Sequence, residues 1–257
     1  APYHLVVNTG LNCIGVPYDQ ALGFLSQVDF HRALDLKGVF THFATAELPD
    51  SIDLQRQVTR FVDAVNGMQA AGFDVGLVHC ANTAATLRYP QLHFDMVRAG
   101  IALYGYHPCF ETRSVISLRP AMSVHARITD VRSVSVGESA SYGLYYRGAG
   151  SASKVCTIPV GYGDGLPRAL CDRGHVLYQG QLMNLVGTIS MDHSMFEVDL
   201  RPRAGRPRLD PQMGDEVVLV GRQGESSITM EELADLSGTV TYERCCGFGM
   251  RLPKVYV

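Results

Sequence analysis

The chain has 257 residues, of which 46% are hydrophobic and 18% are charged, and its formal net charge at pH 7 is −3. This length and composition are typical of a globular protein with one large domain or two ordinary ones. The sequence contains no basic run typical of a nucleic-acid surface, no apolar run of membrane-spanning length and no signal peptide at its start. We therefore expect a soluble protein that binds neither nucleic acid nor membranes.

Strand and helix patterns alternate in the first half of the chain. Four short segments are rich in Val, Leu and Phe and are bounded by turn residues, as buried parallel strands are; they cover residues 4–8, 38–42, 76–79 and 94–97. The alternation predicts a parallel sheet of βα units. A closed (β/α)8 barrel has eight units and the sequence contains about four, so residues 1–113 are expected to be the second half of a TIM-type barrel, with about 120 residues absent upstream.

The clearest helix pattern covers residues 51–71. Asp50 or Ser51 can cap its start, and Gly72 ends it. Its apolar residues recur at helical spacing and predict one buried stripe, which consists of Ile52, Val58, Phe61, Val62, Val65 and Met68.

The pattern changes near residue 113. Residues 121–134 alternate like a half-exposed strand, and further strands bounded by glycines are expected at 154–160, 175–178, 182–186, 195–198 and 216–220, with one short helix at 229–236. Residues 114–257 are therefore expected to form a mostly antiparallel β domain.

Seven cysteines are scattered along the chain without a CxxC pair, and Cys245 and Cys246 are neighbours, a poor geometry for an ordinary disulfide. Such thiols are typical of a reducing compartment. We expect structural thiols, a cytoplasmic protein and no metal site.

The most informative segment lies between His79 and Gly105. A polar turn at Asn82 and Thr83 follows one predicted strand, and the next predicted strand places Arg98 directly at its end. A charge at the end of a buried parallel strand needs a partner or a ligand, and the turn at Gly100 frees backbone amides that can hold an anion. A cation, a hydroxyl and free amides around one point suit a phosphorylated aromatic cofactor.

Several motifs together carry a family resemblance. GVFTHFATA, HCANTAATLRYP, FDMVRAGIALYGYHP, SASYG, IPVGYGDGLPR, GTISMDH, MGDEVVLVG and TYERCCGFGMRLPKVYV occur in this order, and over essentially its whole length the chain resembles the bacterial alanine racemases. The resemblance implies a PLP-binding barrel followed by a β domain, in a homodimer whose active sites are each completed by the partner subunit. It also implies an isomerase that interconverts L- and D-alanine by two-base chemistry on pyridoxal 5'-phosphate, in the D-alanine biosynthesis that serves the cell wall.

The resemblance assigns Arg98 to the pyridine nitrogen of the cofactor. Arginine stays protonated, so that nitrogen stays largely unprotonated and the ring becomes a weaker electron sink. Taken alone, Arg98 would be interpreted as a structural residue paired with Asp95 or with a carbonyl at a strand end; within MVRAGIALYG the cofactor role is favoured.

Phosphate contacts are implied for Thr83, Gly100 and Ile101, as one hydroxyl and two amides, and for Tyr242 from the β domain. Asn82 and His42 resemble residues that orient Arg98 and the ring; outside this context His42 is more typical of a satisfied core histidine.

Tyr142 matches the second catalytic base. A tyrosine can act so only when positive charge or donors lower its pKa, and His42 and Arg98 of the partner subunit are the expected helpers. Met191 and Asp192 match a segment that meets the substrate carboxylate in the partner's site, and Tyr162 resembles a residue at the entrance.

The sequence departs from the family in two places. The Schiff-base lysine of the first barrel strand has no counterpart, because neither Lys37, Lys154 nor Lys254 fits it. In HLVVNTGLNCIG, residues that are Lys, Asp and Arg in many members are replaced, and Cys13 cannot supply the bidentate cation of that arginine; the replacing residues are Val6, Asn8 and Cys13.

Three functions remain open at this point: a truncated or split alanine racemase that is inactive alone, a degenerate homologue that binds without turnover, and a serine racemase of the same family. We favour the first. Related PLP barrels such as amino-acid decarboxylases place a carboxylate against the pyridine nitrogen, and Arg98 argues against them.

Overall fold

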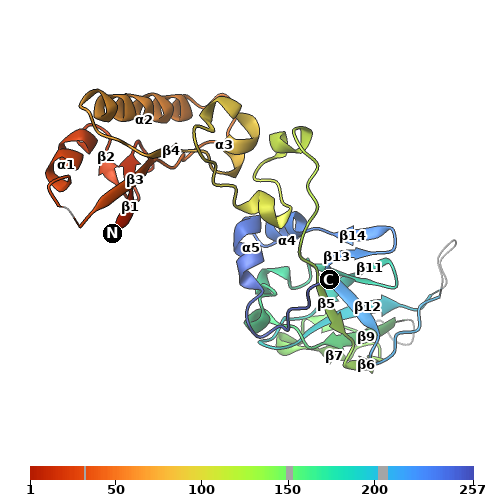
Figure 1. The fold of residues 1–257 in the computed structure, drawn as a ribbon. Helices are drawn as coiled ribbons and strands as arrows, with labels where there is room; N and C mark the ends of the chain where they lie inside the picture. The colour runs from red at the N-terminus through yellow and green to blue at the C-terminus, as the bar shows by residue number, and fades with distance from the viewer. Residues whose placement is uncertain (32, 149–152, 202–207) are drawn as a thin grey trace. The chain divides into compact units, whose positions relative to one another are not determined.

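The computed structural model describes residues 1–31, 33–148, 153–201 and 208–257. They divide into two compact units, Ala1–Ala121 and Met122–Val257 (Figure 1), and the domain boundary expected near residue 113 lies shortly before this division. No helix within the described residues is long and apolar enough to cross a membrane.

A parallel sheet forms the centre of the N-terminal unit. Its strands are ordered β2-β1-β3-β4, and every pair is parallel, as the sequence predicts. The strands are β1 (Pro2–Asn8), β2 (Val16–Pro17), β3 (Asp35–Phe40) and β4 (Leu77–His79).

Helices pack against one face of this sheet, as Figure 1 shows for α1 (Ala21–Val28) and α2 (Ile52–Ala70). Side chains alternate between the two faces of a strand, and those toward the helices, such as Leu5 and Val39, belong to one buried core with Leu25 and Phe61. The opposite face carries the alternate residues of each strand. The remaining helices are α3 (Thr83–Arg88) and the 3-10 helices η1 (Pro90–Leu92), η2 (Ile101–Tyr104) and η3 (Phe110–Ser114).

Helix α2 begins as predicted, since the Ser51 side chain accepts a hydrogen bond from the Leu54 amide. The predicted stripe is wrong at one position, because Ile52 is 70% exposed. Gln57 is buried instead, and its amide group bonds to the Thr9 hydroxyl (3.2 Å), the His42 carbonyl (3.1 Å) and the Ala44 amide (2.9 Å). The periodicity of apolar residues could not predict that Gln57 is buried, because a buried polar side chain is stable only with hydrogen-bond partners that the fold supplies.

The strand predicted at residues 94–97 is not formed. Phe94 has a left-handed backbone (φ 45°), and the Asp95 carboxylate accepts the Val78 amide proton at 2.8 Å, where a paired strand would offer a carbonyl. In this segment, the Asp95 amide donates to the Val78 carbonyl on β4, and the Arg98 amide donates to the Ala81 carbonyl just after β4. The segment is therefore an extended connection that still brings Arg98 beside the end of β4.

The C-terminal unit has one large antiparallel sheet ordered β14-β13-β10-β11-β12-β9-β6, with β5 paired to β13. All of its strand pairs are antiparallel, which confirms the expected type of domain. The strands are β5 (Val124–Arg127), β6 (Asp130–Arg132), β9 (Ser153–Ile158), β10 (His175–Tyr178), β11 (Gln181–Val186), β12 (Ser194–Asp199), β13 (Glu216–Gln223) and β14 (Ser226–Ile228); β7 (Ser139–Ala140) and β8 (Tyr146–Arg147) form a separate hairpin.

The single strand expected at residues 121–134 is two strands. Ile128 donates its amide proton to Asp215 beside β13, whereas Thr129 donates to Thr157 on β9, so the chain changes partner strands between these residues. The short helices are η4 (Tyr142–Leu144), η6 (Tyr162–Asp164), η7 (Arg168–Leu170), α4 (Met230–Leu236) and α5 (Thr241–Gly247). Helix α4 was predicted; β14 and α5 were not.

Candidate functional site

Arg98 lies on the face of the N-terminal sheet that the helices leave uncovered. Its guanidinium donates to His79 Nδ1 at 2.5 Å, to the Thr41 carbonyl at 2.7 Å and to His42 Nδ1 at 3.2 Å. It also lies 5.0 Å from the centre of the Phe40 ring, a cation–π contact. The side chain is thus half-buried and held from several sides. Asp95, one partner considered for a purely structural role, is not among these partners, whereas the Thr41 carbonyl just after β3 is a strand-end carbonyl of the kind that this role also allows.

The histidines around Arg98 are kept neutral. Burial, then Arg98, then His4 lower the pKa of His79 to about 4. Burial and Arg98 also lower the pKa of His42, with Glu47 opposing them. Because burial and cations both disfavour a charged imidazole, the guanidinium is the positive charge of this cluster.

The polar turn after β4 is joined to the segment after Arg98. The Arg98 amide donates to the Ala81 carbonyl at 2.9 Å, and the Gly100 amide donates to Thr83 Oγ1 at 2.8 Å. The expectation of a free Gly100 amide is therefore wrong, because this amide already donates a hydrogen bond to the Thr83 hydroxyl oxygen. Ile101 begins η2, and the first amide of a helix has no acceptor within that helix.

Space is left beside these groups. A Cβ built on Gly100 would have only Thr83 Oγ1 within 4 Å, at 3.8 Å. The Thr83 hydroxyl and the Ile101 amide beside an open volume fit the phosphate of a PLP-type cofactor, and the cation of Arg98 lies two residues before Gly100 in the same segment. The residues present fit the phosphate and the ring of the cofactor, but they include no lysine that could attach it covalently.

Asn82 has another task in the structure than the expected orientation of Arg98. Its Oδ1 accepts the Ala85 amide proton at 3.0 Å and caps α3. The capping fixes the turn that presents Thr83, and the orientation of Arg98 by Asn82 stays a prediction.

The replaced positions lie along β1 and the loop after it. Val6 is half-buried on β1, and Asn8 Oδ1 accepts the amide protons of Gly10 and Asn12, both at 3.1 Å. Cys13 is exposed, as a free thiol. Nothing in these contacts replaces the cation expected in many family members.

The lysines take no part in this cluster. Lys37 pairs with Asp35 at 2.9 Å and Lys154 with Asp210 at 3.0 Å, while Lys254 is exposed near the C-terminus. Within the described residues, no group of three or more His, Cys, Asp or Glu side chains is arranged to hold a metal ion.

Tyr142 and Asp192 line one hollow of about 620 Å³ in the C-terminal unit. The Ser141 hydroxyl joins the two loops that carry them, because it donates to the Thr188 carbonyl (2.8 Å) and accepts the Thr188 amide proton (3.0 Å). The Tyr142 side chain is 73% exposed, as a group that acts outside its own unit would be. The hollow is lined by Ser141, Tyr142, Gly143, Leu144, Thr157, Thr188, Ser190, Asp192, His193, Ser194 and Met195.

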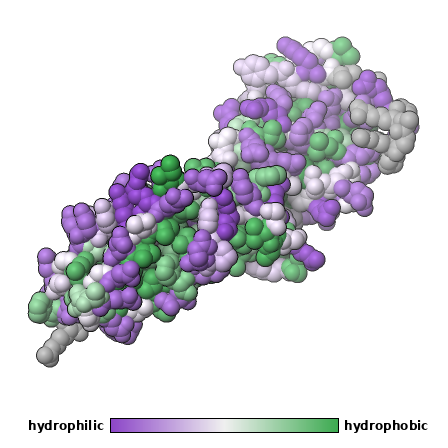
Figure 2. All heavy atoms as spheres, turned by 90° about the horizontal axis from the view of Figure 1, so that it is seen from above, coloured by the Kyte–Doolittle hydropathy of each residue, from purple (hydrophilic) through white to green (hydrophobic). Residues whose placement is uncertain are grey.

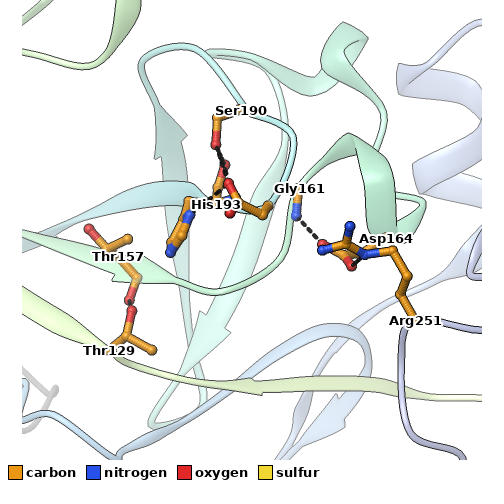
Figure 3. Close-up of polar contacts among 8 residues, drawn as sticks. Thr129, Thr157, Gly161, Asp164, Ser190, His193 and Arg251 are labelled. Atoms are coloured by element: carbon orange, nitrogen blue, oxygen red, sulfur yellow. Dashed lines mark hydrogen bonds and ion pairs between the residues drawn. The ribbon is translucent and has the colours of Figure 1, made fainter.

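Tyr162 and Met191 come together in neighbouring loops of the same unit. The amides of Tyr162 and Gly163 donate to the carbonyls of Ser190 (3.0 Å) and Met191 (2.8 Å). Figure 3 shows how the first loop is anchored: the buried Asp164 carboxylate accepts the Gly161 amide proton and the Arg251 guanidinium proton, both at 2.9 Å. In the second loop, Asp192 pairs with His193 at 2.9 Å. The hydrogen bond with His193 is the main cause that lowers the pKa of the Asp192 carboxyl.

Tyr242 lies on α5 of the C-terminal unit, with its side chain 44% exposed. The structure thus groups the predicted residues around Arg98 and Thr83 in one unit and in the loops of Tyr142, Tyr162 and Asp192 in the other, with Tyr242 apart on α5. Sequence reasoning missed His4 and His79, which extend the hydrogen bonds of Arg98, and Gln57, which bonds to the His42 carbonyl; the signal for His79 was a histidine at the end of a predicted strand.

The parallel α/β unit and the antiparallel β domain define the class of fold, and comparisons with known proteins specify the family. The alanine racemase N-terminal domain model matches residues 1–108, and the alanine racemase C-terminal domain model matches residues 121–256. The chain belongs to the alanine racemase family, whose members use pyridoxal phosphate.

Relatives match along the whole chain. It is 37% identical to the alanine racemase of Nostoc over 256 residues, covering 100% of this chain and 64% of the relative, and 39% identical to that of Carboxydothermus hydrogenoformans, covering 99% and 67%. The solved alanine racemase of Bacillus anthracis with bound L-Ala-P is similar with a TM-score of 0.91 at 33% identity, covering 100% of this chain and 64% of that one. The chain thus spans about two thirds of the length of the relatives it matches.

Proposed function

We propose that these 257 residues form the cofactor-ring, phosphate and second-base part of an alanine racemase, which interconverts L- and D-alanine. The observation that carries the proposal is the guanidinium of Arg98, fixed at 2.5 Å from His79 and 2.7 Å from the Thr41 carbonyl, two residues before the amides at Gly100. Because His79 and His42 are neutral, the charged group facing the ring nitrogen of the cofactor would be the Arg98 guanidinium, a permanent cation that cannot give up its proton.

In this proposal the chain's residues have separate tasks. Arg98 contacts the pyridine nitrogen, Thr83, Gly100 and Ile101 bind the phosphate, and Tyr242 adds a further phosphate contact. The bound cofactor supplies stabilisation of negative charge at Cα of the substrate.

Proton transfer and substrate binding fall to the loops of the C-terminal unit. Tyr142 removes or supplies the Cα proton on one face, and the Met191–Asp192 segment meets the substrate carboxylate in the partner subunit, with Tyr162 at the entrance. We propose a homodimer, in which the exposed Tyr142 reaches a cofactor cluster and is assisted by His42 and Arg98 of the partner subunit. We also propose that the protein is cytoplasmic and that its D-alanine serves the cell wall.

We further propose that the N-terminal unit is the second half of a barrel and that a lysine outside these 257 residues attaches the cofactor, since Lys37, Lys154 and Lys254 lie elsewhere. On this proposal the 257-residue chain is inactive alone. The exposed Cys13, which leaves the carboxylate without its bidentate cation, favours a second candidate, a homologue that binds the cofactor without turnover. Serine as the substrate is the third.

The test is racemisation of D-alanine and D-serine, followed by chiral chromatography, for the chain alone and with a co-expressed lysine-bearing barrel half from a relative. We expect no racemisation alone and racemisation of alanine when the half barrel is present. Tyr142→Phe should abolish it, whereas Tyr145→Phe, at a neighbouring exposed tyrosine, should not. A cofactor-loaded but inactive complex would favour the non-catalytic homologue; faster turnover of serine would favour the third candidate.

A further inference from the structure

Two histidines extend the hydrogen-bond chain of Arg98 across the sheet. His79 Nδ1 accepts from Arg98 at 2.5 Å, and His79 Nε2 lies 2.8 Å from His4 Nδ1. The two imidazole rings are 5.1 Å apart and tilted by 54°. The chain therefore runs from the guanidinium over β4 to β1, away from the groups assigned to the cofactor.

The direction of the protons in this chain follows from the guanidinium. Arginine has donors and no acceptor, so His79 Nδ1 must be the acceptor and carries no proton. Neutral His79 then has its proton on Nε2, which donates to His4 Nδ1. His4 in turn accepts at Nδ1 and, when neutral, carries its proton on Nε2.

Strand β3, which lies between β1 and β4, makes this contact possible through Gly38. The residue is opposite His4 in the parallel register, and a Cβ on it would lie 2.6 Å from His4 Nδ1 and Cε1. Any other residue would push the His4 ring away. Phe40, two residues further on, stacks on His79 with the ring centres 4.9 Å apart and an interplanar angle of 7°, which fixes the His79 plane.

We propose that His4 and His79 are positioning residues for Arg98: they form a proton-ordered chain that holds the guanidinium in one direction, and a second proton on either imidazole breaks it. A protonated His4 has N–H groups on both ring nitrogens and cannot accept from His79. The inference rests on the proposed function only in taking Arg98 as the residue that contacts the cofactor ring. The proton order of the two histidines does not depend on a bound cofactor.

Few other charges face the two rings. On β3, Asp35 and Lys37 neutralise each other in an exposed pair at 2.9 Å. Next to His79, burial raises the pKa of the Cys80 thiol to about 12, which keeps it uncharged. On the far side of Arg98, His42 accepts from the same guanidinium, with Glu47 as the nearest acid acting on it. From β2, Val16 and Pro17 bring no titratable group.

The experiment is nitrogen-15 NMR of the histidine side chains in the full 257-residue protein, combined with the rotation rate of the Arg98 guanidinium. At neutral pH we expect His79 to be unprotonated at Nδ1 and protonated at Nε2, with slow rotation of Arg98. His79 protonated at Nδ1 would overturn the inference, and this readout needs no variant.

Substitution of His4 tests its own share. We expect at least threefold faster guanidinium rotation in His4→Leu and recovery in His4→Gln, whose side-chain oxygen can accept in place of Nδ1. His175→Leu, which removes a histidine bonded to Asn184 in the other unit, should have no effect. An unchanged rotation rate in His4→Leu would refute the role of His4.

This result is separable from the proposed function. A chain with the expected proton order that fails to bind a phosphorylated pyridine would retain the positioning inference and remove the cofactor site. Binding together with a reversed or mixed His79 tautomer would do the opposite.

Discussion

Acidification should destabilise the N-terminal unit through His79. Its imidazole is 3% exposed, and burial, Arg98 and His4 lower its pKa from 6.5 to about 4. The folded protein therefore binds fewer protons at this site than the unfolded chain between these two values, and the free energy of unfolding falls as the pH is lowered through that window.

The size of the effect follows from the two pKa values. At 1.36 kcal/mol per pH unit, the full difference corresponds to about 3 kcal/mol, and screening at the neighbouring partly exposed groups reduces it to about 1–3 kcal/mol. Above pH 6.5 the contribution is fully present, and below about pH 4 it is lost.

The assay is urea unfolding at a series of pH values for the wild-type chain and for His79→Asn, followed by a probe in the N-terminal unit. Many groups titrate in this range, but the difference between the two proteins isolates His79. We expect the difference in unfolding free energy to shrink by about 1–3 kcal/mol between pH 7 and pH 4.5. A constant difference, or an NMR titration of His79 in the folded chain near 6.5, would refute the reasoning.

Three substitutions test the packing around the site. Gly38→Ala should destabilise the N-terminal unit by about 1–3 kcal/mol in thermal unfolding, because the new Cβ lies 2.5 Å from the Leu77 carbonyl oxygen; Gly23→Ala, with nothing within 4 Å, should be neutral or stabilising, and equal effects would contradict the close approach. Gln57→Ala should cost about 2–3 kcal/mol through its lost buried hydrogen bonds, and the exposed Gln55→Ala almost nothing, a difference that urea unfolding measures. Arg251→Ala should cost about 1–2 kcal/mol and speed proteolysis at residues 161–165, since a buried carboxylate loses its cation; unchanged cleavage would show that the loop does not depend on this pair.

The sequence was most informative where local chemistry decides the structure. Ser51 caps α2, and the Gly72 turn ends it with φ 89°, so both ends could be read from residue types alone. The strands at residues 175–178 and 216–220 were found because alternation and glycine-bounded turns do not depend on distant partners. The parallel and antiparallel halves followed from the same patterns.

Prediction failed where a distant side chain takes over a backbone or core role. Residues 94–97 have strand-like composition, yet the Asp95 carboxylate occupies the position of a ladder carbonyl. Gln57 was not in the predicted buried stripe but is buried, because Thr9 and the His42 carbonyl supply hydrogen-bond partners to its side chain. Ile52 was expected to be buried but is exposed. Periodicity contains no information on such partners.

The candidate site divides in the same way. Arg98, Thr83 and Gly100 were found from a motif, and the structure joins the last two by one hydrogen bond. His4 and His79 are 75 residues apart, and only the strand register and the absent side chain of Gly38 bring their rings together. Hydrophobic residues also reach the surface on the face shown in Figure 2. The exposed hydrophobic side chains of the N-terminal unit include Phe30 and Phe110.

The central claim is that Arg98, Thr83 and the Ile101 amide next to Gly100 form a site for a phosphorylated pyridine. Its most direct measurement is phosphorus-31 NMR titration of the 257-residue chain with pyridoxine 5'-phosphate, which cannot react with lysines. The account predicts saturable binding that Thr83→Val weakens at least tenfold and that Thr59→Val, at an exposed threonine of α2, leaves unchanged. No saturable binding, or equal affinities in the two variants, would contradict it.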